Sequence, residues 1–524
     1  MVIRPVSRAS RHDAPRSETD VLYDLIKMAY VSAACLAGVA LLYIAVDKKL
    51  RPDVMAMGLA ALAVLSAIFL SPNIYVLFAL MFLICPFFCR KSEHIAGVLI
   101  MSTLLTPEIQ TDLYIGGTRL ITFSAADALG LGAALALFMQ GKKAKGVASS
   151  DLLIFAMVLL LIFFEARGTS ATNLARVTSQ VCLDILIPCW VVMRSLKSEN
   201  HMKIFMLILI GAGCILSSIL IMESITGWPI FREALARYGL SPSWEHAKWR
   251  YGFLRAAGPF SESTSMAVAL VFPFLAAWQF KSILPNAMRY LVIGLLFVGV
   301  SACQSRNAHL GLIIGIVAAM AYRKFHKPSA RASLFASAFL LVTLPAGILL
   351  MPPQGQAAES ETDSTVSYRA QLLKRGTEEI RKNPLTGTDI ETVTARMEDM
   401  RQGEHIIDFV NSYLYVTLLS GIIGLFIFIC IILYAPIKTS IAIKHASNKF
   451  KFENYTFLYS ASICIIPMLL FTFFGERIML MMLIVIGMVD YVSKLLESRV
   501  KRDRSRRNFS ISDHNGPLTI KRQP

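Results

Sequence analysis

Residues 408–436 read DFVNSYLYVTLLSGIIGLFIFICIILYAP, and this stretch decides the fold. A helix needs about 20 apolar residues to cross a bilayer, and the run after Asn411 meets that length. A long polar insert, 352–408, precedes it in a chain that is otherwise mostly apolar. We therefore expect a membrane helix at 411–436 that begins at the end of a large polar loop.

Similar apolar runs recur along the whole chain. Apolar residues make up 55% and charged residues 17% of the sequence, whereas soluble domains carry about 25% charged residues. The runs lie at 25–46, 54–70, 73–89, 119–140, 151–167, 175–194, 202–223, 263–280, 287–304, 307–322, 332–351, 411–436, 455–473 and 476–493. We predict an all-α protein, a polytopic transmembrane helical bundle of about 12–14 spans with a large helical periplasmic loop between late spans.

Basic residues in short loops predict the orientation of the bundle, because such loops stay in the cytoplasm. They occur at 142–145, 194–203, 281–289, 323–331 and 438–451. With fourteen spans, these loops share one face. The short apolar stretch 94–106 reads equally as re-entrant, interfacial or a further span. As a span it would bring the basic loops 47–51 and 90–91 to the cytoplasm but would export the basic N-terminus, so we prefer fourteen spans.

This orientation divides the chain into alternating membrane and loop regions. They are a cytoplasmic tail, membrane helices, a periplasmic loop, more membrane helices, the large periplasmic loop, the last membrane helices and a basic cytoplasmic tail, at 1–24, 25–223, 224–262, 263–351, 352–410, 411–493 and 494–524. We expect a multi-pass protein of the bacterial inner membrane whose active face is periplasmic.

The net charge of +17 does not indicate nucleic-acid binding, because much of it lies in the tail 494–524. Basic segments beside a span attract anionic lipid, and we rank RNA binding below this anchoring. The nine cysteines lie in or at the edge of apolar runs, which favours core residues over a disulfide framework. We find no P-loop, dinucleotide-binding turn or His-Glu-x-x-His motif, so we expect no cofactor, no metal and no nucleic-acid partner.

The insert has the pattern of a helical loop. Apolar or small residues recur every four positions from Tyr368 to Ile380 and predict a helix over 365–382. Asn383-Pro384 ends it, since proline cannot continue a helix. A second, more polar helix is expected over 390–401.

The outer loop 224–262 predicts a short helix around Leu235 that lies along the membrane surface. Trp228, Trp244 and Trp249 add aromatic surface beside it. An interfacial belt is one interpretation, because tryptophan favours that depth, and sugar stacking is the other. We favour the belt for Trp228 and leave both interpretations open for Trp244 and Trp249.

Three arginines are candidates for binding a phosphate-bearing substrate. Arg255 precedes a span, Arg306 lies in a turn between two spans, and Arg369 opens the helix of the insert. An arginine at membrane depth costs about 2.5–3.5 kcal/mol, which favours a functional role, and a guanidinium binds two phosphate oxygens at once. The alternatives are a turn residue that reaches water for Arg306 and an exposed helix residue for Arg369. Converging at the outer leaflet, the three would suit a lipid-linked diphosphate.

Asp408, His405 and Asn411 lie at the mouth of the span after the insert and are the catalytic candidates. A carboxylate or imidazole there can take a proton from a sugar hydroxyl. Aspartate is also a favoured helix cap, so Asp408 has a purely structural alternative, and His405 has one as a solvated loop residue. Glu262 either caps the helix that follows it or faces the site.

Asp127, Asp184 and Glu223 lie within or at the ends of apolar runs, where a transporter would use them to carry protons. Asp184, with Pro188 in the same helix, is the best case. Few such groups are present, and the other candidate charges gather at one face. Transporters instead place them around a midplane site between paired halves, so a secondary transporter or flippase ranks lower.

The second half of the chain, about residues 200–435, resembles the O-antigen ligase and Wzy-type polysaccharide polymerase superfamily. The order of its motifs is more specific than any motif alone. In order, they are Arg255-Ala-Ala-Gly258-Pro-Phe260, Ser305-Arg306-Asn307, Tyr368-Arg369, Asn383-Pro384-Leu385-Thr-Gly387, Asp408-Phe-Val-Asn411-Ser-Tyr-Leu and Gly421-Ile-Ile-Gly424-Leu.

The resemblance implies a metal-independent membrane glycosyltransferase whose donor is an undecaprenyl-diphosphate-linked glycan. It implies that Arg255 and Arg306 hold the diphosphate and stabilise the charge of the leaving group, while an acceptor sugar hydroxyl attacks the anomeric carbon. Membrane lipid is an expected partner, and a flippase and a chain-length regulator are candidate partners.

One position departs from the pattern of the ligases in this group. They carry a His-Asn pair at the mouth of the span after the large loop, whereas Val410 precedes Asn411 here. The departure favours a polymerase that joins repeat units of a surface polysaccharide. A ligase that moves finished glycan to another acceptor is the alternative, and a transporter or flippase is the alternative from another class.

Overall fold

A computed structural model of the protein describes residues 18–89, 91–141, 148–240, 248–285, 287–325, 361–401, 407–442 and 449–492. The predictions for His405, Trp244, the span 332–351, the basic N-terminus and the basic tail 494–524 lie outside the described residues.

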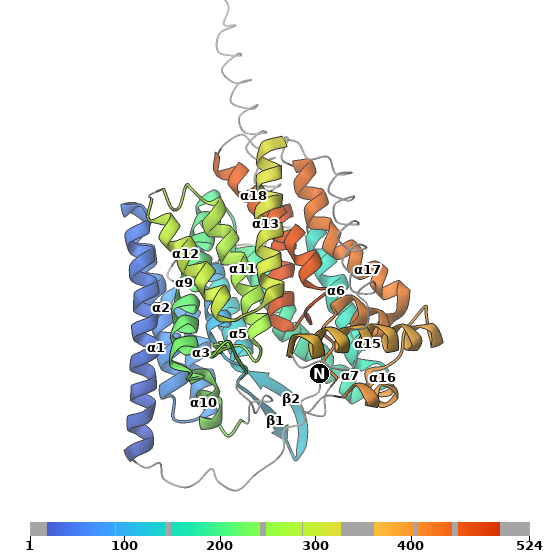
Figure 1. The fold of residues 1–524 in the computed structure, drawn as a ribbon. Coiled ribbons are helices and arrows are strands. Elements are labelled where there is room, and N and C mark those ends of the chain that lie inside the picture. The colour runs from blue at the N-terminus through green and yellow to red at the C-terminus, as the bar shows by residue number, and fades with distance from the viewer. Residues whose placement is uncertain are drawn as a thin grey trace, which may run out of the picture.

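Helices make up nearly all of the described chain, with two short β-hairpins at one end of the bundle (Figure 1). The first half contains α1 (Glu18–Ala45), α2 (Arg51–Leu70), α3 (Ile74–Phe88), α4 (Ser92–Leu105), β1 (Gln110–Ile115), β2 (Thr118–Ser124), α5 (Ala125–Met139), α6 (Ser149–Ala166), α7 (Ala171–Val181), α8 (Ile187–Ser195), α9 (Glu199–Thr226) and α10 (Ile230–Arg237). The second half contains β3 (Trp249–Arg250), β4 (Phe253–Leu254), α11 (Ser263–Gln279), α12 (Arg289–Ala302), α13 (Arg306–Phe325), α15 (Glu361–Lys382), α16 (Ile390–Arg396), α17 (Ser412–Ala442), α18 (Lys449–Met468) and a helix over 476–492.

Length and composition show a multi-pass membrane protein. Six described helical stretches are long and apolar enough to cross a bilayer: α1, α2, α6, Ala171–Ser195, α9 and α17. Shorter apolar helices accompany them, namely α3, α4, α5, α11 and α12. The predicted all-α polytopic helical bundle is therefore confirmed.

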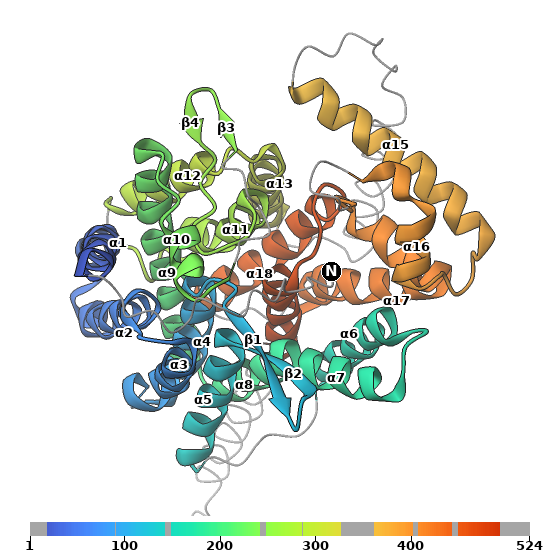
Figure 2. The ribbon, with the colours of Figure 1, turned by 90° about the horizontal axis from the view of Figure 1, so that it is seen from below.

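Helix α9 lies at the centre of the first half, where α1, α4, α11 and α12 pack against it (Figure 2). Of the six long apolar stretches it is the most completely buried. Its sequence is apolar on nearly all sides, as expected for a helix surrounded by other helices. In the second half, α13 and α18 pack together, and α11 contacts both of them as well as α9.

Helix α4 is a buried element of the bundle and not a surface segment. It packs against α5, α8 and α9. With α4 counted as one more pass through the bundle, α1 begins at the same end of the bundle as α10. There, Arg237 forms an ion pair with Asp24 at 3.0 Å. The prediction put the tail 1–24 and the loop 224–262 on opposite faces, whereas this ion pair places the end of that tail, at Asp24, beside the loop. The prediction failed because it did not count the stretch 94–106 as a span.

The predicted span 119–140 begins as a β-strand. Strands β1 and β2 form an antiparallel hairpin, and α5 starts only at Ala125. The Ser124 hydroxyl accepts from the Asp127 N–H at 3.0 Å, and the Asp127 carboxylate accepts from the Ser124 N–H at 2.8 Å. This capping box gives Asp127 a structural role at the start of α5, which weakens the case for a proton carrier there.

The described part of the insert folds as two helices joined by a turn. Helix α15 ends at Lys382, directly before Asn383-Pro384, as predicted. Helix α16 is shorter than predicted, because it ends at Arg396 and a 3₁₀ turn, Glu398–Met400, follows. The predicted short helix in the outer loop is also present, as α10.

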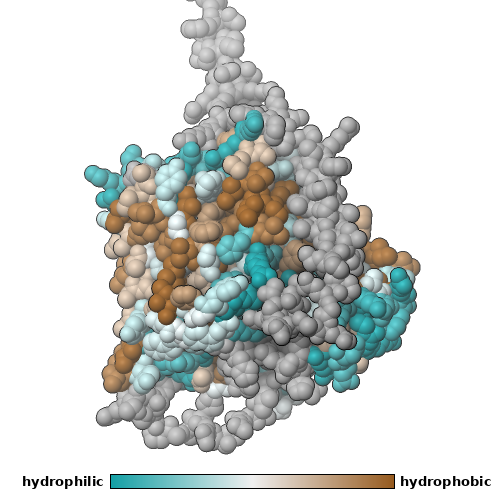
Figure 3. Space-filling model, in the orientation of Figure 1, coloured by the Kyte–Doolittle hydropathy of each residue, from teal (hydrophilic) through white to brown (hydrophobic). Residues whose placement is uncertain are grey.

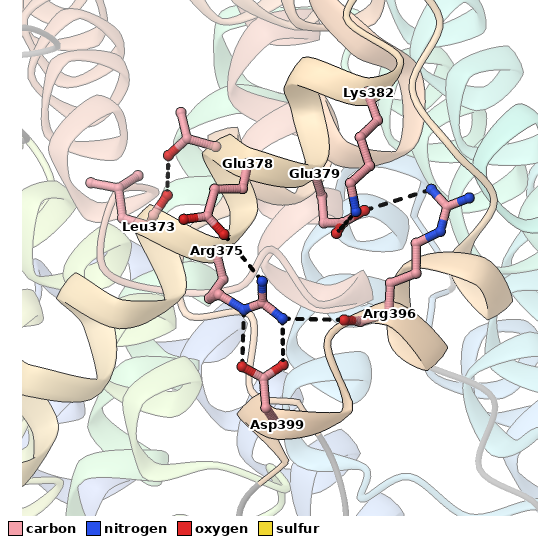
Figure 4. A network of polar contacts seen from close by, with 8 residues as sticks. Leu373, Arg375, Glu378, Glu379, Lys382, Arg396 and Asp399 are labelled. Atoms are coloured by element: carbon pink, nitrogen blue, oxygen red, sulfur yellow. Dashed lines mark hydrogen bonds and ion pairs between the residues drawn. The ribbon is translucent and has the colours of Figure 1, made fainter.

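A network of ion pairs holds these two helices together (Figure 4). Arg375 donates through Nε and Nη2 to the two carboxylate oxygens of Asp399, each at 2.9 Å. Lys382 and Arg396 both contact the buried carboxylate of Glu379. Exposed ion pairs contribute little stability unless they are bidentate or networked, and this group is both. These three basic residues therefore stabilise the insert itself.

Candidate active site

The end of α18 gathers three of the motifs found in the sequence. Backbone carbonyls within 468–472 accept hydrogen bonds from the side-chain amide of Asn307 at 3.0 Å, from the N–H of Ser412 at 2.9 Å and from its hydroxyl at 2.6 Å. Asn307 follows Arg306, and Ser412 opens α17. These bonds therefore bring the starts of α13 and α17 to one place.

Arg369 reaches the same place from α15, which packs on α17. Its guanidinium carbon lies 5.7 Å from the centre of the Phe471 ring. Burial lowers the pKa of Arg369, and the neighbouring charge of Arg306 acts in the same direction, whereas the Asp408 carboxylate opposes both. Two arginines thus converge at this end of the bundle. A bound anion would relieve their repulsion and the cost of burying Arg369.

Tyr368 holds two segments of the insert in place, one at Met400 and one at Asp408. Its hydroxyl accepts from the N–H of Asp408 at 3.1 Å and lies 3.3 Å from the carbonyls of Asp408 and Met400. Burial raises the pKa of Tyr368 to about 12, so the hydroxyl keeps its proton at neutral pH. Because Tyr368 directly precedes Arg369, one helix turn positions both the arginine and the aspartate.

Asn411 caps α17, since its side-chain oxygen accepts from the N–H of Leu414 at 3.1 Å. The structural alternative for Asp408, that it caps this helix, is therefore contradicted. Asparagine is a favoured capping residue because its short side chain reaches the free N–H groups of the first helical turn. The described contact of Asn411 is structural, and a catalytic part for it stays a prediction.

Glu262 interacts electrostatically with Asp408 of the cluster. It directly precedes α11, where its side chain caps no backbone N–H but bonds to the Ser265 side chain. Burial raises the pKa of Glu262 to about 7, the Asp408 carboxylate adds to the rise, and Lys248 opposes it. A carboxyl group with a pKa near the operating pH can serve efficiently as a general base. Of the two roles left open by the sequence, the structure favours the one in the site.

Arg255 lines a small pocket. The pocket is lined by Glu223, Arg232 and the backbone around Gly258. The Glu223 carboxylate accepts from the Gly258 N–H at 2.9 Å. The pairing of Arg255 with Arg306 stays a prediction. The charge of Arg306 acts on Arg369, so these two arginines lie near each other.

Arg477 is a residue of this region that sequence reasoning missed. It donates to the carbonyl of Pro259 at 3.0 Å, and its guanidinium lies over the Phe260 ring, 4.6 Å from the ring centre. It thereby anchors the segment that leads to Glu262. The available signal was the charged pair Glu476-Arg477 at the start of an apolar run, where charges are costly.

The turn after α15 inserts into a break in α17. Gly421 interrupts that helix with φ 64° and ψ −163°, a backbone region that is essentially restricted to glycine. The N–H of Thr388 donates to the carbonyl of Leu418 at 2.8 Å, and the N–H of Ile422 donates to the carbonyl of Pro384 at 2.9 Å. The turn thus satisfies backbone groups that the break exposes, as a broken membrane helix requires.

Two glycines allow this contact. A Cβ on Gly387 would lie 2.5–2.6 Å from backbone atoms of Leu418 to Ser420, and one on Gly421 would lie 2.3–2.6 Å from those of Leu385 and Thr386. Arg167, at the end of α6, closes the contact by donating to the carbonyls of Thr386 and Leu419. The Asn-Pro-Leu-Thr-Gly motif and the glycine of α17 are therefore two halves of one junction, which we call the 387/421 junction.

The fold and the site together define a class: a multi-pass membrane protein with converging arginines and carboxylates at one end of its bundle. Residues 290–429 match the family model of the O-antigen ligase domain. The matched segment runs from α12 into α17 and contains Arg306, Arg369 and Asp408. The resemblance of this part of the chain to the O-antigen ligase and Wzy-type superfamily is thereby confirmed, and the match supports a role in polysaccharide biosynthesis of the ligase or polymerase type. No curated protein matches the chain.

Proposed function

We propose that the protein is a polymerase that joins undecaprenyl-diphosphate-linked oligosaccharide repeat units into a surface polysaccharide at the periplasmic face of the inner membrane. The proposal is carried by the charges that meet at Asp408. Arg369 interacts with Asp408 and with Arg306, and Glu262 interacts with Asp408 from another element. All but Glu262 lie within the matched O-antigen ligase segment.

In the proposed reaction, Arg306 and Arg369 bind the diphosphate of the donor. Glu262 removes the proton from an acceptor sugar hydroxyl, whose oxygen attacks the anomeric carbon of the donor glycan. The bond between that carbon and the phosphate oxygen breaks, and undecaprenyl diphosphate leaves with the electron pair. The two guanidinium groups stabilise the negative charge that develops on the leaving oxygen. In this proposal they supply the positive charge that a metal ion provides in other phosphate-leaving reactions.

Val410 supports the polymerase over the ligase, because the histidine expected of a ligase is absent from the position before Asn411. Here the carboxylate of Glu262 supplies the basic group from another element. The competing function from another class is transport of the lipid-linked unit. If the protein were a transporter, its loss would leave single units on the cytoplasmic side.

These functions can be distinguished by deleting the gene in a cell that depends on this protein for its polysaccharide. With the gene deleted, the polymerase proposal expects single lipid-linked repeat units on the periplasmic side, and complementation restores long polymer. Loss of transfer to a second acceptor, with polymer still attached to the lipid, would show a ligase instead. Accumulation of single units on the cytoplasmic side would show a flippase.

The pKa of Glu262 predicts the pH dependence of the reaction. The base must be deprotonated, so the rate should rise about tenfold per pH unit below pH 7 and level off above it. Glu262→Gln should lower the rate about 10²–10⁴-fold and abolish this rise. Initial rates across a pH series measure both effects.

Asp408→Asn provides the companion test. Removing the Asp408 charge removes one cause of the raised Glu262 pKa, so the midpoint of the profile should move to lower pH. A Glu262→Gln enzyme that keeps the wild-type rate and profile would exclude Glu262 as the base.

A further inference from the structure

The hairpin of β3 and β4 carries three aromatic side chains that are half or more exposed. Its two strands pair antiparallel, and Tyr251-Gly252 forms the turn between them. Tyr251 is 80% exposed, Phe253 is 53% exposed and Trp249 is 52% exposed. Side chains of this size usually bury most of their surface, so three of them exposed on one short hairpin indicate a partner outside the chain.

The hairpin backbone is strained at its tip. Tyr251 has φ 54°, and Gln304 has φ 51°; among the described residues these two alone combine a positive φ with a side chain other than hydrogen. Tyrosine gains no burial within the protein in return for this conformation, which glycine or asparagine would adopt more easily. Strain of this kind is retained mainly where function requires it.

Gln304 contacts both strands of the hairpin, one residue beyond the Tyr251-Gly252 turn on each side. The side-chain amide of Gln304 donates to the carbonyl of Phe253, and Arg250 donates to the carbonyl of Gln304, each at 3.4 Å. The N–H of Ala256 also donates to the carbonyl of Ala302 at 3.2 Å. Gln304 stands two residues before Arg306, so the hairpin is bonded directly to the turn that carries a site arginine.

The surroundings of the hairpin point to lipid. It projects sideways from the bundle beside α12 and α13 (Figure 2). The outward face of α12 exposes Leu291, Phe297 and Val298, and hydrophobic side chains cover the surface where α12 and α13 lie (Figure 3). The aromatic tip continues this apolar face at the end of the bundle that holds the site.

We propose that the β3–β4 hairpin is an interfacial anchor, whose Trp249, Tyr251 and Phe253 enter the headgroup region of the leaflet on the side of the site. Aromatic residues favour this depth because their rings are apolar and their polar atoms still reach water. Through Gln304, the anchor holds Arg306 at the level of lipid phosphates. This second step rests on the proposed function, since it assumes a lipid-linked diphosphate as substrate.

Fluorescence quenching tests the anchor without any enzymatic assay. The full-length protein and its Trp249→Phe variant are placed in vesicles whose acyl chains carry bromine either near the headgroup or near the bilayer centre. The emission that the substitution removes should be quenched by bromine, and more by the shallow position than by the deep one. Tyr251→Trp, at the most exposed position of the hairpin, should add emission that is quenched in the same order.

Two results would overturn the anchor. If brominated lipid quenches the emission from neither position, the hairpin lies in water. If brominated lipid does not quench the emission, but adding soluble repeat-unit oligosaccharide shifts the emission spectrum, the hairpin is a sugar-stacking surface.

The link to Arg306 is tested separately by kinetics. The double variant Tyr251→Ser with Phe253→Ser should raise the apparent KM for an undecaprenyl-diphosphate-linked donor several-fold in vesicles and leave kcat unchanged. In detergent micelles, which have no fixed leaflet depth, the variant and the wild type should match. Substituting Tyr114 and Ile115, which are exposed on the β1–β2 hairpin, is the matched control. Normal quenching with an unchanged KM in vesicles would refute the positioning step and leave the anchor standing.

Discussion

Arg369→Ala is expected to abolish most of the activity while the protein stays folded. The side chain lies near Arg306 and Asp408, on the helix α15 of the insert, where it would contact the diphosphate of the donor. A hydrogen bond to a charged group contributes about 1.5–3 kcal/mol, so affinity for undecaprenyl diphosphate alone should fall about 10–100-fold. The rate should fall further, about 10²–10³-fold, because the charge on the leaving oxygen is largest in the transition state.

The measurements are a thermal shift with undecaprenyl diphosphate in detergent and the initial rate of glycan transfer. Arg306→Ala should lower the affinity and the rate by similar factors. The double variant should lose less binding free energy than the sum of the two single losses, since both side chains bind one ligand. Arg369→Lys should recover part of the binding but not its bidentate geometry. Arg375→Ala is the matched control on the same helix, because Arg375 pairs with Asp399 within the insert. Equal losses in the Arg375 and Arg369 variants would show that charge on α15, and not this site, governs activity.

Gly421→Ala is expected to have the largest effect on stability. The substitution meets backbone atoms of Leu385 and Thr386 at 2.3–2.6 Å and imposes a side chain on φ 64° and ψ −163°. Backbone strain and overpacking each cost about 1–3 kcal/mol, so the free energy of unfolding should fall by roughly 3 kcal/mol or more. Gly387→Ala should act similarly, since it lies on the other side of the 387/421 junction.

Thermal unfolding in detergent and limited proteolysis of the insert measure this loss. We expect cleavage between α15 and α16 to become faster, because the turn between them can no longer enter the break in α17. Gly294→Ala in α12 is the control, since a Cβ there meets no atom within 4 Å and alanine favours a helix by up to about 1 kcal/mol. Unfolding of Gly421→Ala at the wild-type temperature, with an unchanged cleavage pattern, would contradict the role assigned to the junction.

Helical periodicity and motif order predicted the architecture and much of the site region. The helix from Tyr368 onward, its end at Asn383-Pro384 and the closeness of Arg306 to Arg369 all agree with the structure. These features are local, or they follow from placing loops at one end of a bundle. They could therefore be predicted without knowing how distant segments pack.

The features that could not be predicted depend on packing. Nothing local shows that the turn around Gly387 fills the break at Gly421, because the two halves of the junction are more than thirty residues apart. The raised pKa of Glu262 arises from burial and from Asp408 on another element. The start of the stretch 119–140 is apolar enough for a span, yet it pairs as a hairpin with residues before it.

The central claim is that Arg306 and Arg369 hold a lipid diphosphate while glycan units are joined. Its most direct test is a time course in proteoliposomes supplied with purified lipid-linked repeat units, with chain length read on a gel. The proposal predicts that the wild type and Arg375→Ala build lengthening polymer, while Arg369→Ala leaves the units single. Polymer of normal length and rate from Arg369→Ala, or units that cross the membrane without being joined, would contradict it.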